Sequence, residues 1–174
     1  MSVIFKKRVI TIISLVVVVA VAVTASIIAW KYIQSGKKNG SGISKMSTRQ
    51  IVDSIIEQMS YRDITLIDES QLLRHYDVDT DMIDEFTMYV SSNIESAFEI
   101  ACFKLDTAES VGAMTTSITE HMNNKAAGYM ELNPVQYNMI MSYQTAVIEN
   151  YVFVVVSNDA EAAKQIFTDM CNSK

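Results

Sequence analysis

The longest apolar run of the chain extends from Val9 to Trp30 and holds 22 residues without a charged side chain. At about 1.5 Å of rise per residue, a helix of this length matches the roughly 30 Å hydrocarbon core of a bilayer. A single segment in lipid must be helical, because no other element satisfies its backbone polar groups. The pattern predicts a short cytoplasmic tail at residues 1–8 and a transmembrane anchor at residues 9–30.

A cleavable signal peptide is the alternative interpretation of this region. Ala20-Val21-Ala22 and Val23-Thr24-Ala25 resemble cleavage sites, but the apolar run continues past both, which favours an uncleaved anchor. The basic residues Lys6-Lys7-Arg8 stand directly before the run, whereas the lysines after it are spread along a linker. Because positive charge beside a span favours the cytoplasmic side, we expect a single-pass protein of the cell membrane with its domain on the extracytoplasmic side.

Residues 31–46 are expected to form a flexible basic linker. The stretch from Ser35 to Gly42 contains only Ser, Gly, Lys and Asn, a composition typical of a mobile tether. Its glycines do not form a phosphate-binding loop, because neither Gly40 nor Gly42 is followed by the Lys that this motif requires. The remaining residues, 47–174, are predicted to fold as one domain.

Five helices are expected in this domain. The capping-box pattern Ser47-Thr48-Arg49-Gln50 opens the first, whose apolar positions recur at helical spacing up to Met59. A second capping-box pattern, Asp106-Thr107-Ala108-Glu109, opens a long helix that continues through Met122. Further helices are expected at Ser70–Tyr76, from Asn133-Pro134 to about Ser142, and after Asn158-Asp159-Ala160-Glu161.

Four strands are expected between these helices, and their positions are Phe86–Val90, Ala97–Lys104, Thr145–Ile148 and Tyr151–Val156. The last two are joined by Glu149-Asn150, a tight turn in which Asn150 is expected to adopt positive φ. The order is ββα followed by ββα, which predicts an α+β domain with a mostly antiparallel four-stranded sheet packed by helices. The similar helix starts of the two halves leave an internal duplication and simple capping chemistry both open.

Several segments of the chain together resemble a known family. These segments are Leu72-Leu73, Tyr76-Asp77-Val78-Asp79, Ala97-Phe98-Glu99-Ile100-Ala101, Tyr129, Asn133-Pro134 and Tyr151 to Ala160. Through them the chain is similar to a bacterial family of small membrane-anchored proteins classed only as a domain of unknown function, over about residues 48–172. Members usually have Gly at the turn before the last strand, where this chain has Asn150. The resemblance implies an extracytoplasmic position in Gram-positive bacteria and supplies no catalytic residue.

Charge is divided unevenly along the chain. Residues 1–45 hold seven Lys or Arg and no acidic residue, while residues 46–174 hold seven Lys or Arg and all 20 acidic residues, a balance of −13. Nucleic-acid binding is disfavoured because phosphate contacts need a basic surface. The linker lysines are better suited to anionic lipid head groups, so membrane lipid is the partner expected for the N-terminal region.

Asp77, Asp79 and Asp81 form the densest acidic cluster. Alternate carboxylates can bind Ca²⁺, but a calcium loop starting at Asp77 would need Gly at Met82 and Glu at Met88. A solvated turn capped by Asp is therefore the favoured interpretation, with a weak calcium site as the alternative.

His75 and His121 are the only histidines, and the chain contains neither HExxH nor GxSxG. His121 is expected to be solvated on the polar face of its helix, and His75 to lie at a helix C-terminus, where the dipole favours its cation. We expect neither to be catalytic, since acid–base chemistry needs several positioned groups. No catalytic, cofactor-binding or metal residue is assigned, and the chain is not expected to be an enzyme or to carry a cofactor.

Cys102 and Cys171 are the only cysteines. Outside the membrane a disulfide between them is chemically allowed. The apolar neighbours of Cys102 in its strand instead favour a buried free thiol.

Both faces of the sheet are expected to be apolar. Phe98, Ile100 and Cys102 alternate onto one face, and Ala97, Ala101, Phe103 and Tyr89 are assigned to the other. Either the helix at Ile51–Met59 covers the second face, or a protein partner or second copy does. The sequence thus predicts a non-catalytic interaction or structural module of the bacterial cell envelope, with an envelope ligand-binding protein or enzyme with an unrecognised site as the alternative.

Overall fold

The computed structural model describes residues 46–172. The tail, the transmembrane anchor at residues 9–30 and the linker up to residue 45 lie outside the described residues, so those predictions stay predictions. Among the helices of residues 46–172, none combines the length and apolar character that crossing a bilayer requires.

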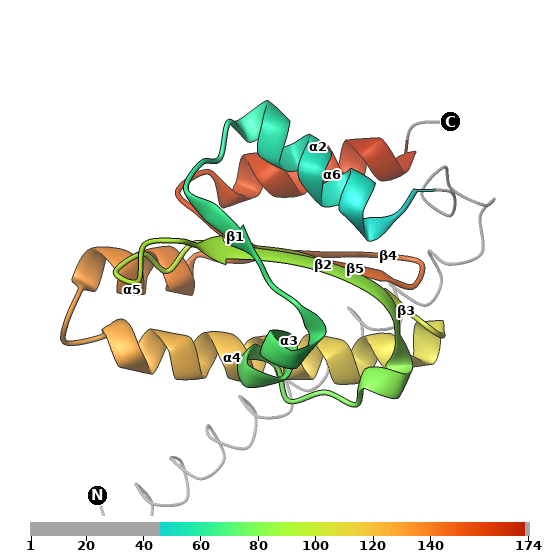
Figure 1. Cartoon of the computed structure of the whole chain (residues 1–174), viewed down its shortest axis with the longest axis horizontal. Helices are drawn as coiled ribbons and strands as arrows, with labels where there is room; N and C mark the ends of the chain where they lie inside the picture. Colours follow the sequence, from blue (N-terminus) through green and yellow to red (C-terminus); the bar gives the residue numbers. More distant parts are fainter. Residues whose placement is uncertain (1–45, 173–174) are drawn as a thin grey trace, which may run out of the picture. The chain divides into compact units, whose positions relative to one another are not determined.

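The centre of the domain is an antiparallel sheet of five strands in the order β1-β2-β3-β5-β4 (Figure 1). The α+β class and the four expected strands are confirmed, but the strand count of four is corrected to five. The additional strand β1 has only three residues, two of them exposed, and therefore lacks the alternation that reveals a strand. The strands are β1 (Ile64–Leu66), β2 (Ile83–Ser91), β3 (Glu99–Leu105), β4 (Gln144–Ile148) and β5 (Tyr151–Val156).

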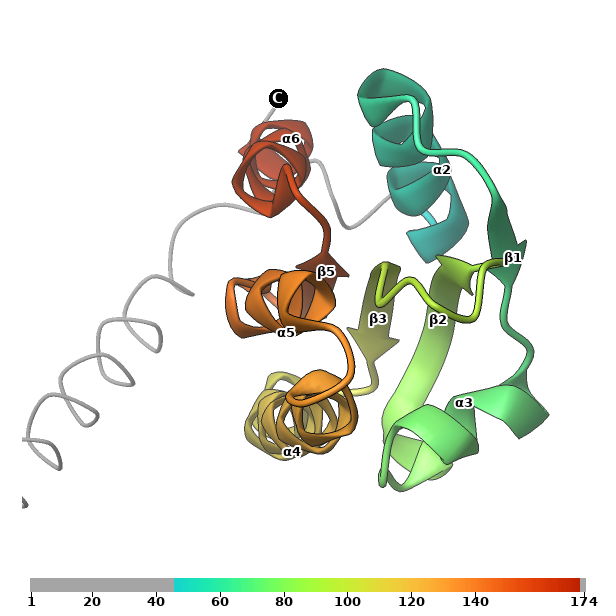
Figure 2. The same ribbon diagram turned by 90° about the vertical axis from the view of Figure 1, so that its left-hand side faces the viewer.

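Two helices, α2 (Thr48–Met59) and α6 (Ala160–Asn172), lie on one face of the sheet (Figures 1 and 2). Their apolar sides pack against Ile100, Phe153 and Val155. The predicted capping box of α2 is confirmed, because the Ser47 side chain accepts from the Gln50 N–H and the Gln50 side chain accepts from the Ser47 N–H.

The opposite face is covered by α3 (Glu69–His75), α4 (Val111–Tyr129) and α5 (Pro134–Met141) (Figure 2). Ala101, Phe103 and Val154 of the sheet pack there with Ile118 and Met122 of α4. The predicted start of α5 is confirmed, with Asn133 accepting from the Gln136 N–H and Pro134 at the first helical position. The domain therefore has three layers, with the sheet between two layers of helices.

This arrangement corrects the assignment of side chains to sheet faces. Tyr89 pairs with Ile100 across the β2–β3 ladder, and directly opposed residues of an antiparallel pair share a face. Tyr89 therefore lies on the α2/α6 face, while Ala101 and Phe103 are fully buried beneath the other helices. Helices of the described residues cover both faces. The helix Ile51–Met59, expected over the face of Ala101 and Phe103, lies on the Ile100 face instead.

Two turns of the structure differ in detail from those predicted. The capping box at Asp106 is wrong: its carboxylate accepts from the Thr107 N–H and the Ser110 hydroxyl, and a 3-10 turn, η3 (Ala108–Ser110), precedes α4. At the β4–β5 turn, a positive φ was expected for Asn150, but Glu149 is the residue that adopts it, with φ of 54°. The Asn150 amide instead donates to the Leu105 carbonyl and ties the turn to β3.

The acidic cluster forms a turn, as expected. Asp79 caps the 3-10 helix η2 (Thr80–Met82) by accepting from the Asp81 N–H. Among residues 46–172, the three carboxylates of Asp77, Asp79 and Asp81 are not a group that converges on a common point.

Both cysteines are free and buried on the α2/α6 face of the sheet. The prediction of a buried free thiol at Cys102 is confirmed. Burial raises the pKa of the Cys102 thiol well above its usual value and that of Cys171 to about 12, so neither is a reactive thiolate near neutral pH.

Candidate functional site

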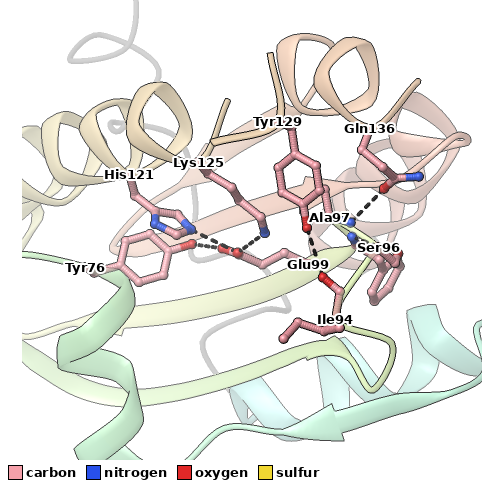
Figure 3. A network of polar contacts seen from close by, with 10 residues as sticks. Tyr76, Ile94, Ser96, Ala97, Glu99, His121, Lys125, Tyr129 and Gln136 are labelled. Atoms are coloured by element: carbon pink, nitrogen blue, oxygen red, sulfur yellow. Dashed lines mark hydrogen bonds and ion pairs between the residues drawn. The ribbon is translucent and has the colours of Figure 1, made fainter. Parts of the chain in front are cut away.

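The most unusual residue of the domain is Glu99, which is fully buried at the start of β3. It belongs to the same face as Ala101 and Phe103, because side chains alternate along a strand. That face is covered by α4, so the carboxylate lies between the sheet and a helix instead of in water (Figure 3).

Three donors converge on this carboxylate (Figure 3). The Tyr76 hydroxyl donates to Oε1, the His121 Nε2 lies 2.9 Å from Oε2, and the Lys125 Nζ lies 2.7 Å from the same Oε2. His121 and Lys125 are four residues apart in α4, so they project from the same side of the helix. Tyr76 follows α3 directly and donates its N–H to the Leu72 carbonyl, which holds its buried ring beside the sheet. We call Glu99, Tyr76, His121 and Lys125 the Glu99 network.

These contacts keep Glu99 ionised despite its burial. Burial by itself would raise the pKa of Glu99, but the charge of Lys125 and the hydrogen bond from His121 hold it well below its usual value. Tyr76 shows the opposite effect, because burial and the adjacent Glu99 charge raise the pKa of its hydroxyl far above the usual value. Glu99 therefore remains an anion and Tyr76 a neutral donor over the physiological pH range.

The structure changes the interpretation of His121. Its side chain is only 10% exposed, so the prediction of a solvated residue is wrong. An ionised carboxylate accepts hydrogen bonds and cannot donate them, which assigns a proton to Nε2 of His121. In the neutral ring the lone pair then resides on Nδ1.

His75 lies at the C-terminus of α3, as expected. Its ring centre is 5.6 Å from that of His121, with an angle of 78° between the planes. The pKa of His75 is lowered, first because the ring is partly buried. Burial therefore outweighs the stabilisation of the His75 cation that was expected from the helix dipole. His75 makes no hydrogen bond within the described residues.

A cavity of about 260 Å³ adjoins the two imidazoles, and we call it the histidine cavity. Ser117 of α4 contributes to its wall, and the Ser117 hydroxyl is buried without a hydrogen-bond partner among the described residues. Such a group is costly unless a bound molecule or water satisfies it. The lining residues are Leu73, Arg74, His75, Tyr76, Asp77, Ser117, Glu120, His121 and Asn124.

Two residues of the cavity lining, His75 and His121, belong with the buried Glu99 to the one group of possible metal ligands found within residues 46–172. One ligand atom each from His75, Glu99 and His121 lie within 4.8 Å of one another. Imidazole nitrogen and carboxylate oxygen are ligands of transition-metal ions such as Zn²⁺. The arrangement is thus able to bind a polar ligand or a metal ion beside a fixed negative charge.

Sequence reasoning placed each histidine in its helix but did not bring them together, and it passed over Glu99. Two signals were available. Glu99 is the one acidic residue among apolar neighbours in a strand buried on both faces, and His121 and Lys125 have the i, i+4 spacing that places two groups on one helix side. The contact with α3 is long-range and has no local signal.

These features define a three-layer α+β domain with an ionised glutamate buried beside a polar cavity. The profile of a protein family described as "Domain of unknown function (DUF4358)" matches residues 57–157. The chain belongs to this family, which confirms the resemblance to a domain of unknown function. The matched residues include all five strands and the Glu99 network. Comparisons with curated proteins and with solved structures find no match.

Proposed function

We propose that this chain is a single-pass, membrane-anchored module of the bacterial cell envelope whose extracytoplasmic domain binds a ligand without transforming it. The observation that carries the binding role is the histidine cavity of about 260 Å³. Its lining includes two imidazoles and Ser117, whose buried hydroxyl has no hydrogen-bond partner among the described residues. Cavities of about 300 Å³ and above are typical of small-ligand sites, so this one suits a small polar ligand or an ion.

The electrostatics of the site favour binding over catalysis. A general acid or base works best with a pKa near the operating pH. The pKa values of Glu99 and Tyr76 are shifted away from this range. The pKa of Glu99 lies far below its usual value, and that of Tyr76 lies far above its usual value. Three hydrogen bonds already occupy the Glu99 carboxylate, so the network serves to hold His121 in place.

The position in the envelope rests on the N-terminal sequence. The 22-residue uncharged run and the adjacent Lys6-Lys7-Arg8 support an anchor with its N-terminus in the cytoplasm. The basic linker supports contact with anionic lipid. A protein partner, if the domain has one, would contact a surface other than the sheet faces, because helices cover both.

Protease treatment of intact cells tests the position. We expect protease to remove the acidic domain and to leave a small membrane fragment, since only the N-terminal tail lies inside. Protection of the domain in cells with permeable walls, with digestion after lysis, would contradict the proposed orientation.

Native mass spectrometry of the full chain, purified in mild detergent from its membrane, tests the binding role. We expect a bound small molecule or ion as a mass adduct of the wild type. The variant His75→Phe, which occupies part of the cavity, should lose the adduct, and Leu132→Ser, at an exposed residue outside the cavity lining, should retain it. An adduct that persists in His75→Phe would show binding elsewhere.

A further inference from the structure

We propose that His75 and His121 together bind one first-row transition-metal dication in the histidine cavity, with Zn²⁺ as the reference ion, and that Glu99 is a positioning residue for His121. This inference rests on the proposed use of the cavity as a binding site and names the class of its ligand. Within residues 46–172, no hydrogen bond engages either nitrogen of His75 or the Nδ1 of His121.

The separation of the two rings suits a shared ion. Two imidazoles that bind one ion at about 2.0–2.1 Å have ring centres about 5–6 Å apart. The ring centres of His75 and His121 are 5.6 Å apart, and their planes are inclined by 78°. The candidate ligand atoms of the group also lie within 4.8 Å of one another. His121 is held by Glu99, so rotation of the His75 ring would complete the pair of nitrogens on one ion.

Glu99 fits the position of an outer partner better than that of a direct ligand. Its Oε2 already accepts from His121 Nε2 and Lys125 Nζ, at 2.9 and 2.7 Å. Direct ligation would displace Lys125, which is only 16% exposed, and breaking a buried pair is strongly unfavourable. A carboxylate that accepts from one ring nitrogen fixes the tautomer and presents the other nitrogen to a metal. That other nitrogen of His121 is Nδ1.

The charge around the cavity is compatible with a cation. Glu99 and Lys125 neutralise each other. Among the lining side chains, Asp77 and Glu120 contribute two negative charges and Arg74 contributes one positive charge. The balance is negative when both imidazoles are neutral, so a dication enters a site that is not already positive.

The remaining features of the cavity determine the class of ion. Two imidazoles are ligands for Zn²⁺, Cu²⁺ or Ni²⁺, whereas Mg²⁺ and Ca²⁺ prefer sets of oxygen ligands. Two protein ligands leave coordination positions for water. The buried hydroxyl of Ser117, which lacks a partner among the described residues, would gain one from a metal-bound water.

Isothermal titration calorimetry tests this site with the full chain in detergent, without a polyhistidine tag and near neutral pH. We expect one Zn²⁺ per chain and no comparable binding of Ca²⁺ or Mg²⁺. His75→Ala and His121→Gln should each weaken Zn²⁺ binding at least about tenfold. Gln at position 121 keeps an N–H for Glu99 but lacks the second ring nitrogen, so it separates ligation from folding.

Asn124→Ala is the matched control, because Asn124 lines the same cavity and has no imidazole. It should bind Zn²⁺ like the wild type. The inference is wrong if Zn²⁺ does not bind, if Ca²⁺ binds equally well, or if Asn124→Ala reduces binding as much as the histidine variants. Should His121→Gln fail to fold, His75→Ala decides the question, since His75 makes no hydrogen bond within the described residues.

The two proposals fail separately. Absence of Zn²⁺ binding, together with an organic adduct that His75→Phe removes, would overturn the metal site and leave the binding function standing. Absence of both the metal and any adduct dependent on the cavity would overturn both.

Discussion

At the scale of single residues, Glu99 determines the chemistry of the domain. Removing a carboxylate from water costs several kcal/mol even after relaxation, and Tyr76, His121 and Lys125 offset this cost with three hydrogen bonds. The same contacts connect β3 to α4 and to the residue after α3. A change at Glu99 is therefore expected to affect both the stability of the domain and the orientation of His121.

Replacing Glu99 by Gln tests this role through its pH dependence. We expect destabilisation by about 3 kcal/mol near neutral pH, because the charge of Lys125 loses its buried partner. The pKa of Glu99 is lower in the folded than in the unfolded chain, so its carboxylate contributes stability that is complete above the ordinary value of 4.5 and is lost as pH falls through the folded value. Urea unfolding at several pH values should show the difference between wild type and Glu99→Gln shrinking below about pH 4.5.

A difference that stays constant down to the acid unfolding of the wild type would contradict this account. It would mean that packing at position 99, and not ionisation, carries the effect. Glu95→Gln is a suitable control, since Glu95 is an exposed acid in the loop before β3 and its replacement should change stability by less than about 0.5 kcal/mol at any pH.

The two histidines should differ in their contribution to folding. His121→Ala removes a hydrogen bond to a buried charge and is expected to cost about 1.5–3 kcal/mol. His75→Ala removes a partly buried ring without a hydrogen bond in the described structure and should cost less than about 1 kcal/mol. Thermal or urea unfolding of the two variants measures this, and equal losses would contradict the assigned hydrogen bonding.

The residue scale also shows where sequence reasoning was insufficient. The polar neighbours of His121 in the sequence indicated a solvated position, and only packing of α4 on β3 reveals that the ring faces Glu99. At the turn of Glu149 and Asn150, too, a contact with a residue distant in sequence changes what the local sequence indicates. The positive φ falls on Glu149 because Asn150 is engaged with Leu105 of another strand, a contact between residues distant in sequence.

At the scale of elements, the start of α2 is fastened to the sheet by a polar contact. Both the N–H and the hydroxyl of Thr48 lie 2.9 Å from Oε1 of Glu85, and the hydroxyl is 3.0 Å from that of Thr87. Thr48 is fully buried. These bonds join the first turn of α2 to the middle of β2 in addition to the capping box of Ser47.

Thr48→Val should weaken this attachment while preserving the shape of the side chain. We expect a loss of about 1–3 kcal/mol, because the hydroxyl of Thr87 loses a buried partner. Hydrogen exchange should show faster opening of α2 than in the wild type, with β5 unchanged. Thr48→Ser retains the hydroxyl and should be milder; equal effects of Val and Ser would point to packing instead of hydrogen bonding.

Most elements were predictable because their signals are local. Caps at Ser47 and Asn133 and the continuous apolar run Tyr151–Val156 mark elements without reference to the rest of the chain. Strand β1 was not predictable, because it is an edge strand held by pairing with Tyr89–Ser91 rather than by burial of its own side chains. Its existence depends on a partner 25 residues further along.

At the scale of the whole domain, two apolar clusters lie on opposite faces of one sheet. Both clusters consist of residues within 46–172. A domain of about this length buries around two-thirds of the surface that its unfolded chain exposes. We expect residues 46–174, produced without the N-terminal segment, to fold in solution. A cooperative unfolding transition with native far-ultraviolet circular dichroism would confirm this, and a non-cooperative transition would contradict it.

Coverage of both sheet faces leads to a last prediction about where substitutions are tolerated. Ala101 is fully buried beneath the α3/α4/α5 layer, whereas Leu132 in the α4–α5 connection is 86% exposed. Ala101→Asp places an unpaired charge among apolar side chains and should destabilise the domain by more than about 4 kcal/mol. Leu132→Asp should change stability by less than about 0.5 kcal/mol. Soluble yield and urea unfolding measure both effects. A folded Ala101→Asp domain with altered self-association would contradict the three-layer packing and restore an exposed sheet face as a contact surface.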